Sequence, residues 1–214
     1  NRETVENIYL PEIEERLRQE DPSIDRFFWF DWRLRSSEDQ VNAGLLDLND
    51  YTTFWKPSME IHVDQSPSAV LHRIKLQLSE DSERLLKGRV RILNYRKLSF
   101  CVWRPLKDVI EDFPLAVCDR TTVSNSELIA SDHVRQAFVG ESFYLRPNDT
   151  HKWFYLSKQQ PDEALIMKMF DSQESAKAKF CPHASFRMPN GIQGTRPRRT
   201  IEAHVMVFNY QKAG

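Results

Sequence analysis

The sequence predicts a mainly β fold with flanking helices (α+β). After Gly88, short runs of β-branched and aromatic residues follow one another, separated by turns that contain Pro, Asn or Asp. No helical pattern lies between these runs, which is typical of an antiparallel sandwich or barrel. The helical patterns lie mostly before Gly88, so we expect helices beside a β core.

The first part of the chain alternates helical and extended patterns. Residues 11–19 begin with Pro and place Ile13 and Leu17 on one face, which predicts a short helix. Residues 26–34 are dense in aromatic side chains and predict a strand. Residues 36–57 form a long polar connection.

A second helical region follows a short extended segment at residues 59–64. Ser66 and Pro67 form a helix start, and an apolar pattern continues from there to Leu78. Another helical piece ends at Gly88, a residue that commonly follows a helix.

The β-rich part is expected to contain strands separated by turns. They are predicted at residues 90–93, 100–103, 115–118, 143–145, 153–156, 164–170 and 201–208. We expect one domain over residues 1–214, with a helical and mixed part at about 1–88 and a β-rich part at about 89–214. Because Asn1 stands where an initiator Met would be, the chain is expected to lack an N-terminal portion.

Composition excludes several classes of function. Thirty Lys and Arg against 31 Asp and Glu leave a net charge near zero, which does not favour nucleic acid or an anionic membrane as a partner. No apolar run reaches membrane-spanning length, and no glycine-rich phosphate loop is present in the sequence. The three cysteines are scattered without a Cys-x-x-Cys pair, so we expect a reducing, cytoplasmic setting.

The most informative motif is formed by His62 and Asp64. Alternate residues of an extended segment share one face, so both side chains point the same way. With one distant His, such a pair makes a 2-His-1-carboxylate set, which holds Fe(II) and leaves coordination positions open. His183 is the candidate third ligand, and Arg198 would anchor a dicarboxylate cosubstrate.

Each of these residues also has a simpler interpretation. His62 and Asp64 can be a surface His beside a helix-capping Asp, and His183 can be a packed, hydrogen-bonded His. Arg198 lies in a basic Arg-Pro-Arg-Arg cluster that can be a solvated loop. The order favours the metal site, because a double-stranded β-helix oxygenase has its His-x-Asp early, its distal His on a late strand and an Arg on the last strand.

Nine stretches of the chain resemble the fungal and bacterial hydroxylase/desaturase family that includes gibberellin desaturase and the cephalosporin 7α-methoxylase component. They are residues 62–67 (HVDQSP), 85–89 (LLKGR), 102–106 (VWRPL), 114–122 (PLAVCDRTT), 140–144 (GESFY), 151–155 (HKWFY), 161–172 (PDEALIMKMFDS), 180–186 (FCPHASF) and 197–208 (PRRTIEAHVMVF). Together they occur in the family's order and are spread over residues 62–208.

This resemblance implies a double-stranded β-helix (jelly-roll, cupin-like) core and a non-heme iron dioxygenase. Fe(II) would be held by His62, Asp64 and His183, and Arg198 would bind the carboxylate of 2-oxoglutarate. With O2, such an enzyme hydroxylates or desaturates an unactivated C–H bond of a small secondary metabolite. The chain departs from the family at Cys101, where Asn is usual, and at His204, where Arg is usual.

Further residues are candidates for the pocket. Trp153 and Tyr155 share one face of a predicted strand with His151, and they are expected to line the substrate cavity. For His151, a place in the core and a role as a rival metal ligand are the alternatives. Arg104 and Arg120 are expected to help bind the cosubstrate, with the ordering of loops as the alternative.

Two other functions remain open at this point. One is a non-catalytic partner or binding subunit that keeps the oxygenase fold, and the other is a metal enzyme on a cupin-like barrel that uses no keto acid. For the oxygenase, the expected partner is a hydrophobic or amphipathic small molecule. The sequence leaves open a homodimer or heterodimer.

Overall fold

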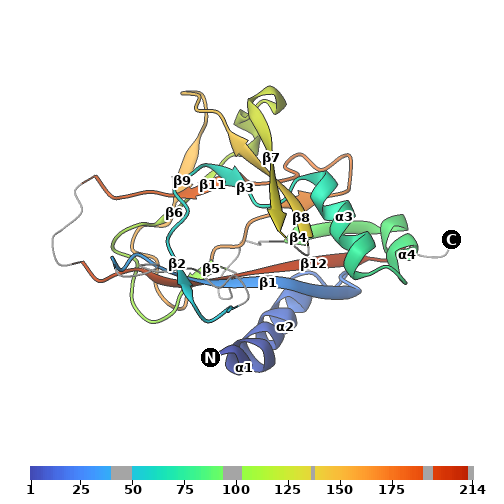
Figure 1. Cartoon of the computed structure of the whole chain (residues 1–214), viewed down its shortest axis with the longest axis horizontal. Coiled ribbons are helices and arrows are strands. Elements are labelled where there is room, and N and C mark those ends of the chain that lie inside the picture. The colour runs from blue at the N-terminus through green and yellow to red at the C-terminus, as the bar shows by residue number, and fades with distance from the viewer. Residues whose placement is uncertain (40–49, 94–102, 136–137, 190–194, 212–214) are drawn as a thin grey trace.

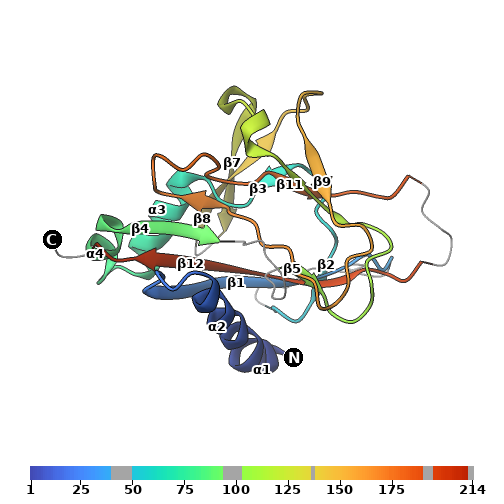
Figure 2. The same ribbon diagram turned by 180° about the vertical axis from the view of Figure 1, so that it is seen from behind.

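A computed structural model describes residues 1–39, 50–93, 103–135, 138–189 and 195–211. Two β-sheets face each other in it, and the first helices lie on the outer side of the longer-stranded sheet (Figure 1). The same layers are visible from behind in Figure 2, where α2 lies below β1 and β12. The predicted mainly β fold with flanking helices is confirmed.

The first sheet has the order β10-β4-β12-β1-β2, and β5 also pairs with β12. All its pairings are antiparallel except that of β1 with β2. Its strands are β1 (Arg26–Ser36), β2 (Phe54–Trp55), β4 (Arg89–Leu93), β5 (Trp103–Pro105), β10 (Phe170–Asp171) and β12 (Arg199–Asn209).

The second sheet has the order β7-β8-β3-β11-β6-β9 and is antiparallel throughout. Its strands are β3 (His62–Val63), β6 (Leu115–Cys118), β7 (Leu128–Arg135), β8 (Phe138–Leu145), β9 (Trp153–Tyr155) and β11 (His183–Ser185). The helical elements are α1 (Arg2–Thr4), a π-helical turn (Val5–Tyr9), α2 (Leu10–Glu20), α3 (Pro67–Gln77), α4 (Ser82–Lys87) and the 3-10 turns Arg120–Thr122 and Asn125–Glu127.

Strand β12 lies between two buried regions, because its side chains point alternately to its two faces. One face of β12 packs against the buried face of α2. The strand contributes Ile201, Ala203, Val205 and Val207 to this cluster, and the helix contributes Leu10, Ile13 and Leu17. The other face contributes Met206 and Phe208 to the core between the sheets. Because strand residues alternate, Glu202 and His204 share this inner face and line the interior cavities.

A β-bulge changes which side chains of β1 face the interior. Its register against β12 shifts between Trp29 and Asp31, so that one extra residue, Phe30, is accommodated. Beyond the bulge Asp31 faces the interior cavity and Trp32 packs on the α2 side. The aromatic pattern that predicted this strand contains no sign of that shift.

Helix α3 begins as its sequence predicts. Ser66 is the N-cap, and its hydroxyl accepts a hydrogen bond from the backbone N–H of Ala69 at 3.2 Å. Pro67 occupies the first turn, where a missing N–H has no cost. Val70 and Ile74 are fully buried in the core between the sheets, so α3 holds the segment that directly follows Asp64.

Most predicted elements are present, and the differences have local causes. The strand expected at residues 164–170 is wrong except at Phe170, because Ile166 and Met167 enter two different core clusters without a continuous ladder. Strands β2, β7 and β11 were not predicted; β11 is only three residues long. Residues 100–102 of another predicted strand lie outside the described residues. Among the described residues, no helix is both long and apolar enough to span a membrane.

A buried carboxylate, Asp171, ties β10 to β4. Its oxygens accept hydrogen bonds from Arg89 at 2.7 and 3.0 Å and from Lys168 at 2.7 Å, and its side chain is fully buried. Burial alone would raise the pKa of Asp171, but these two cations outweigh it and lower the pKa from 3.8 to about 2.

We expect Asp171→Ala to lower the free energy of unfolding by on the order of 3 kcal/mol at neutral pH, because it leaves two cations without their partner. The folded-state pKa is depressed, so this contribution is present above about pH 4 and is lost as the pH falls toward 2. Urea unfolding at several pH values measures it. The exposed Asp132→Ala is the control; an equal, pH-independent loss in both variants would contradict the assignment.

Candidate metal centre

Three predicted ligands meet where β3 pairs with β11. His62 lies directly opposite His183 in the antiparallel ladder, and their ring centroids are 4.4 Å apart. Asp64 follows β3 directly and its side chain reaches the same point. One ligand atom from each residue lies within 4.8 Å of the others, so the structure brings together the residues that the sequence places far apart.

The imidazoles are oriented for metal binding by the backbone. His62 Nδ1 lies 2.7 Å from the carbonyl oxygen of Glu60, and His183 Nδ1 lies 3.1 Å from that of Cys181. An Nδ1–H that donates to a carbonyl leaves Nε2 as the electron-pair donor. Both Nε2 atoms face Asp64 Oδ1, at 3.3 Å from His62 and 3.7 Å from His183.

The electrostatics of the cluster keep His183 neutral and Asp64 ionised, the forms that bind a metal. Burial lowers the pKa of His183 to about 4, so this ring is neutral at physiological pH. Burial would raise the pKa of Asp64, but the imidazoles of His183, His204 and His62 outweigh it and hold the pKa well below 3.8. Burial opposes protonation of His62, yet Asp64 outweighs it and raises the pKa of that ring. Two nitrogens and one carboxylate fit a non-heme Fe(II) site.

His204 lies next to the carboxylate of Asp64. It lies on the inner face of β12, stacks on Phe30 and places Nε2 3.5 Å from Asp64 Oδ2. Burial would lower the pKa of His204, but Asp64, Asp31 and Glu202 raise it to about 9. The family usually has Arg here, and a protonated His keeps a cation beside the carboxylate. Cys101, the other departure, lies outside the described residues.

Arg198 is buried and its charge has no anionic partner among the described residues. Only 2% of it is exposed, and its Nη1 donates to the carbonyl of Phe113 and, at 2.7 Å, to the Ser185 hydroxyl. Its Nε and Nη2 find no hydrogen-bond partner in the described part of the chain. Burial, together with the nearby Arg35, lowers its pKa to about 9.

Two cavities meet at the cluster. A narrow one of about 20 Å³ is lined by all three predicted ligands and by Arg198. A wider one of about 260 Å³ is also lined by His62 and Asp64. The narrow cavity therefore lies next to both the predicted ligands and the buried cation of Arg198, whereas the wider cavity lies next to His62 and Asp64.

A partly buried ion pair forms part of both walls. Arg35 from β1 donates to both oxygens of Glu202 from β12, at 2.7 and 2.6 Å, and to the carbonyl of Lys56. Both residues line the narrow and the wide cavity. The sequence did not predict this pair; the available signal was that Glu202 shares a strand face with His204, two positions later in the last strand.

The structure does not bring Arg104 or Arg120 to the cluster. Arg104 lies over the ring of Tyr9, on the side of the first sheet that faces the N-terminal helices. Arg120 stacks on Phe180 and donates to Val123 and Asn125 beside a separate surface cavity. Arg120 thus holds a loop, as in the alternative interpretation, whereas Arg104 contacts the helical turn that contains Tyr9.

Trp153 and Tyr155 lie on the edge strand β9, away from both cavities that meet at the cluster. They are 36% and 46% exposed and line neither of these cavities. The edge position of β9, and the direction in which Trp153 and Tyr155 point, depend on the pairing of β9 with β6. Alternation of residues along the sequence does not reveal that pairing.

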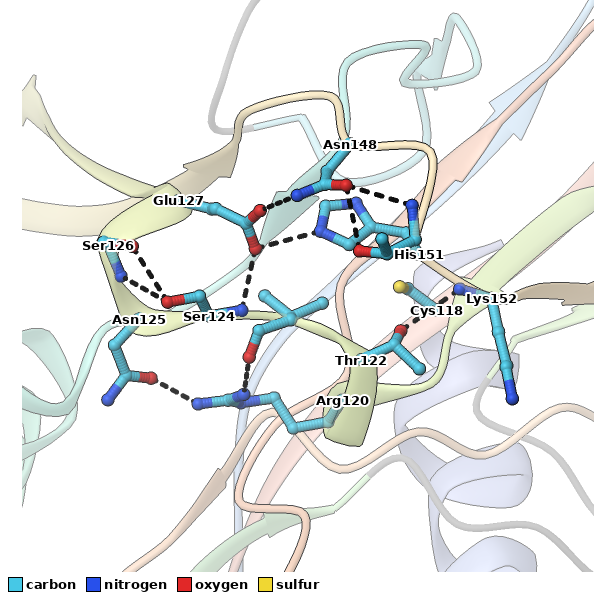
Figure 3. A network of polar contacts seen from close by, with 12 residues as sticks. Cys118, Arg120, Thr122, Ser124, Asn125, Ser126, Glu127, Asn148, His151 and Lys152 are labelled. Carbon is cyan, nitrogen blue, oxygen red and sulfur yellow. Dashed lines mark hydrogen bonds and ion pairs between the residues drawn. The ribbon is translucent and has the colours of Figure 1, made fainter.

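His151 lies in a polar network and lines neither of the cavities that meet at the cluster. Its side chain is buried and its Nε2 lies 3.0 Å from Glu127 Oε2 in the polar network of Figure 3. The same Glu127 accepts a hydrogen bond from the backbone of Ser124 and one from Asn148, which ties a 3-10 turn to the loop before β9. This network holds His151 away from the three ligand residues, so it lies neither in the cavity wall nor at the metal site.

The chain is similar to known proteins in both sequence and structure. A family model described as the oxidoreductase/YMDC permease-like domain matches residues 1–208. The chain belongs to this family. The chain is similar in structure to the iron and alpha-ketoglutarate-dependent endoperoxidase NvfI. The TM-score is 0.81, and the sequences are 26% identical over 98% of this chain and 71% of that one.

Curated relatives of this family member come from fungi. Aspirochlorine biosynthesis protein N of Aspergillus oryzae is 34% identical over 67% of this chain and 58% of its own length. The Fe(II)/2-oxoglutarate-dependent dioxygenase nvfI of Aspergillus novofumigatus is 29% identical over 95% of this chain and 74% of its own. The hydroxylase/desaturase CTB9 of Cercospora beticola is 34% identical over 81% and 53%.

These similarities confirm the hydroxylase/desaturase resemblance and the jelly-roll fold predicted from the sequence. The chain spans between about half and three quarters of the length of these relatives.

A metal-binding measurement tests the three ligands. We expect Fe(II) under anaerobic conditions, or Mn(II), to stabilise the chain by about 2.7 kcal/mol at 100 times its dissociation constant, because only the folded state gathers the ligands. Thermal unfolding with and without metal measures this. His62→Ala, Asp64→Ala and His183→Ala should each lose the stabilisation, whereas His72→Ala on exposed α3 should retain it. Equal stabilisation of all four variants would contradict the assignment.

Proposed function

We propose that this chain carries the core of an Fe(II)- and 2-oxoglutarate-dependent oxygenase that hydroxylates or desaturates a C–H bond of a small secondary metabolite. The observation that carries the proposal is the buried Arg198, which shares a narrow cavity with three convergent metal-ligand atoms. A buried cation without an anion is costly, so the cavity is suited to an acidic ligand next to a metal.

Arg198 suits the distal carboxylate of 2-oxoglutarate. Its Nε and Nη2 are the atoms without partners, and a guanidinium binds a carboxylate through two parallel hydrogen bonds. The Ser185 hydroxyl and the Phe113 carbonyl hold Nη1, so the direction of the fork is fixed. The ring of Trp103 lies 5.0 Å from the guanidinium carbon and adds a cation–π contact.

The narrow cavity has to widen to admit a five-carbon dicarboxylate. Its volume of about 20 Å³ is that of little more than one water molecule. Met167 forms part of its wall, and an unbranched thioether side chain can change rotamer at low cost. We therefore assign the adaptable side of this cavity to Met167 and the fixed side to Arg198.

His62, Asp64 and His183 would hold the iron. Bound there together with 2-oxoglutarate and O2, iron supplies the oxidising chemistry needed for an unactivated C–H bond. The chain's own contribution is to keep His183 neutral, Asp64 ionised and the ligand atoms pre-oriented by backbone carbonyls. The wider cavity, which touches the same ligands, is the space for the substrate.

The biological setting follows from the relatives. Their names describe aspirochlorine biosynthesis, hydroxylase/desaturase and dioxygenase proteins of fungi, which supports a small metabolite of a biosynthetic pathway as substrate. Cys118 and Cys181 are both free thiols, which supports a reducing compartment such as the cytoplasm.

Succinate formation from 2-oxoglutarate tests this function. With Fe(II) and O2 we expect the chain to form succinate, and Arg198→Met to raise the KM for 2-oxoglutarate by roughly 10- to 100-fold, because hydrogen bonds to a charged group are lost. Arg198→Lys should lie between the two, since it keeps the charge without the fork.

The matched control is Arg196→Gln in the same basic cluster. Arg196 is exposed and pairs with Asp108, so the KM of Arg196→Gln for 2-oxoglutarate should equal that of the unmodified chain. Succinate formation with an unchanged KM in Arg198→Met would refute the role of Arg198. Absence of iron-dependent succinate formation in the unmodified chain would refute the oxygenase function.

A further inference from the structure

The wider cavity next to the metal ligands has a polar wall that the proposed reaction does not use. The β-bulge in β1 turns Asp31, Arg33 and Arg35 toward this cavity in place of the apolar residues between them. Arg35 is paired with Glu202, whereas Arg33 keeps a donor without a partner. Bulges often re-aim side chains beside active sites, and this one places a guanidinium in the wall of the substrate space.

Arg33 is held rigidly. It is 5% exposed, and its guanidinium carbon lies 4.2 Å from the ring centroid of Tyr51 and 4.9 Å from that of Trp55. Its Nη2 forms an ion pair with Asp31 at 3.1 Å. Its Nη1 is buried and has no hydrogen-bond partner among the described residues.

A second unpaired donor lies beside the first. Trp55 lines the same cavity, and its indole Nε1 is buried without a hydrogen-bond partner in the described part of the chain. Indole N–H and guanidinium N–H groups can only donate. Buried donors that stay unpaired destabilise the fold, so this corner is complementary to an acceptor oxygen.

We propose that the corner formed by Arg33 and Trp55 binds an acceptor oxygen of the substrate, a carbonyl or carboxylate, and so determines specificity. The corner and the metal ligands line one cavity, so an oxygen held here fixes which C–H bond faces His62 and Asp64. This inference rests on the proposed function, because it assigns the substrate class of that same site. It narrows the expected hydrophobic or amphipathic substrate to one that carries an oxygen function away from the reacting carbon.

The charge of the corner allows both a neutral carbonyl and a carboxylate. Asp31 offsets part of the Arg33 charge, and its own pKa is raised by burial, against the effect of His204 and Arg33. The shared feature is therefore the acceptor oxygen, and the two forms can be separated with matched probes.

The test uses three naphthalenes of similar shape on the full chain without added metal. They are 2-acetylnaphthalene with a neutral carbonyl, 2-naphthoate with a carboxylate, and 2-ethylnaphthalene without an acceptor. Titration calorimetry gives their dissociation constants. We expect at least one acceptor probe to bind about tenfold or more tightly than 2-ethylnaphthalene. The tighter of the two identifies the carbonyl or the carboxylate form.

Two variants locate the preference at this corner. Trp55→Phe removes the N–H but keeps an aromatic ring against Arg33, and Arg33→Met removes the guanidinium. Each should reduce the preference for the acceptor probe to about threefold or less without changing the affinity for 2-ethylnaphthalene. Arg84→Met is the matched control, because Arg84 also stacks on an aromatic ring, that of Tyr210, but lines no part of this cavity.

Equal binding of the three probes, no binding of the acceptor probes up to about 1 mM, or a preference unchanged in Trp55→Phe and Arg33→Met would overturn the proposal. These outcomes are independent of turnover. Loss of succinate formation with a preserved, Arg33-dependent preference would refute the oxygenase function alone. Succinate formation without that preference would refute the acceptor corner alone.

Discussion

The antiparallel pairing of β3 with β11 is the constraint on which the site depends. It sets His62 opposite His183, and Asp64 comes directly after the first of these strands. A shift by one residue would send each side chain to the other face of the sheet, so the register itself assembles the donor set. Helix α3, which begins at Pro67, three residues after Asp64, and buries Val70 in the core, fixes where this register ends.

The facing sheet supplies the charges around that donor set from one strand pair. Strand β12 contributes Glu202 and His204 on its inner face, and Arg198 precedes it. Strand β1 contributes Arg35, and the bulge adds Arg33. The outer faces of the same strands pack under α2, so the polar interior is supported by an apolar layer behind it. Buried arginines and carboxylates thus occupy a rigid sheet instead of loops.

The sequence revealed the residues whose chemistry is local or ordered along the chain. The His-x-Asp spacing, the late His183 and the following Arg198 could be found because strand periodicity and chain order are properties of sequence. The destinations of Arg104, Arg120 and Trp153 could not, because they depend on which strand forms an edge and how a loop returns. The bulge at Phe30 was equally hidden, since a continuous aromatic run reads the same with either register.

The most direct test of the account is an anaerobic titration of the unmodified chain with Fe(II) and then 2-oxoglutarate, followed by visible absorption. A keto acid that chelates iron held by two imidazoles and a carboxylate produces a weak charge-transfer band. We expect this band to grow to saturation at one equivalent of each component and to be absent when either is omitted. Absence of the band with both components in excess would contradict the assignment of His62, Asp64, His183 and Arg198 to one site.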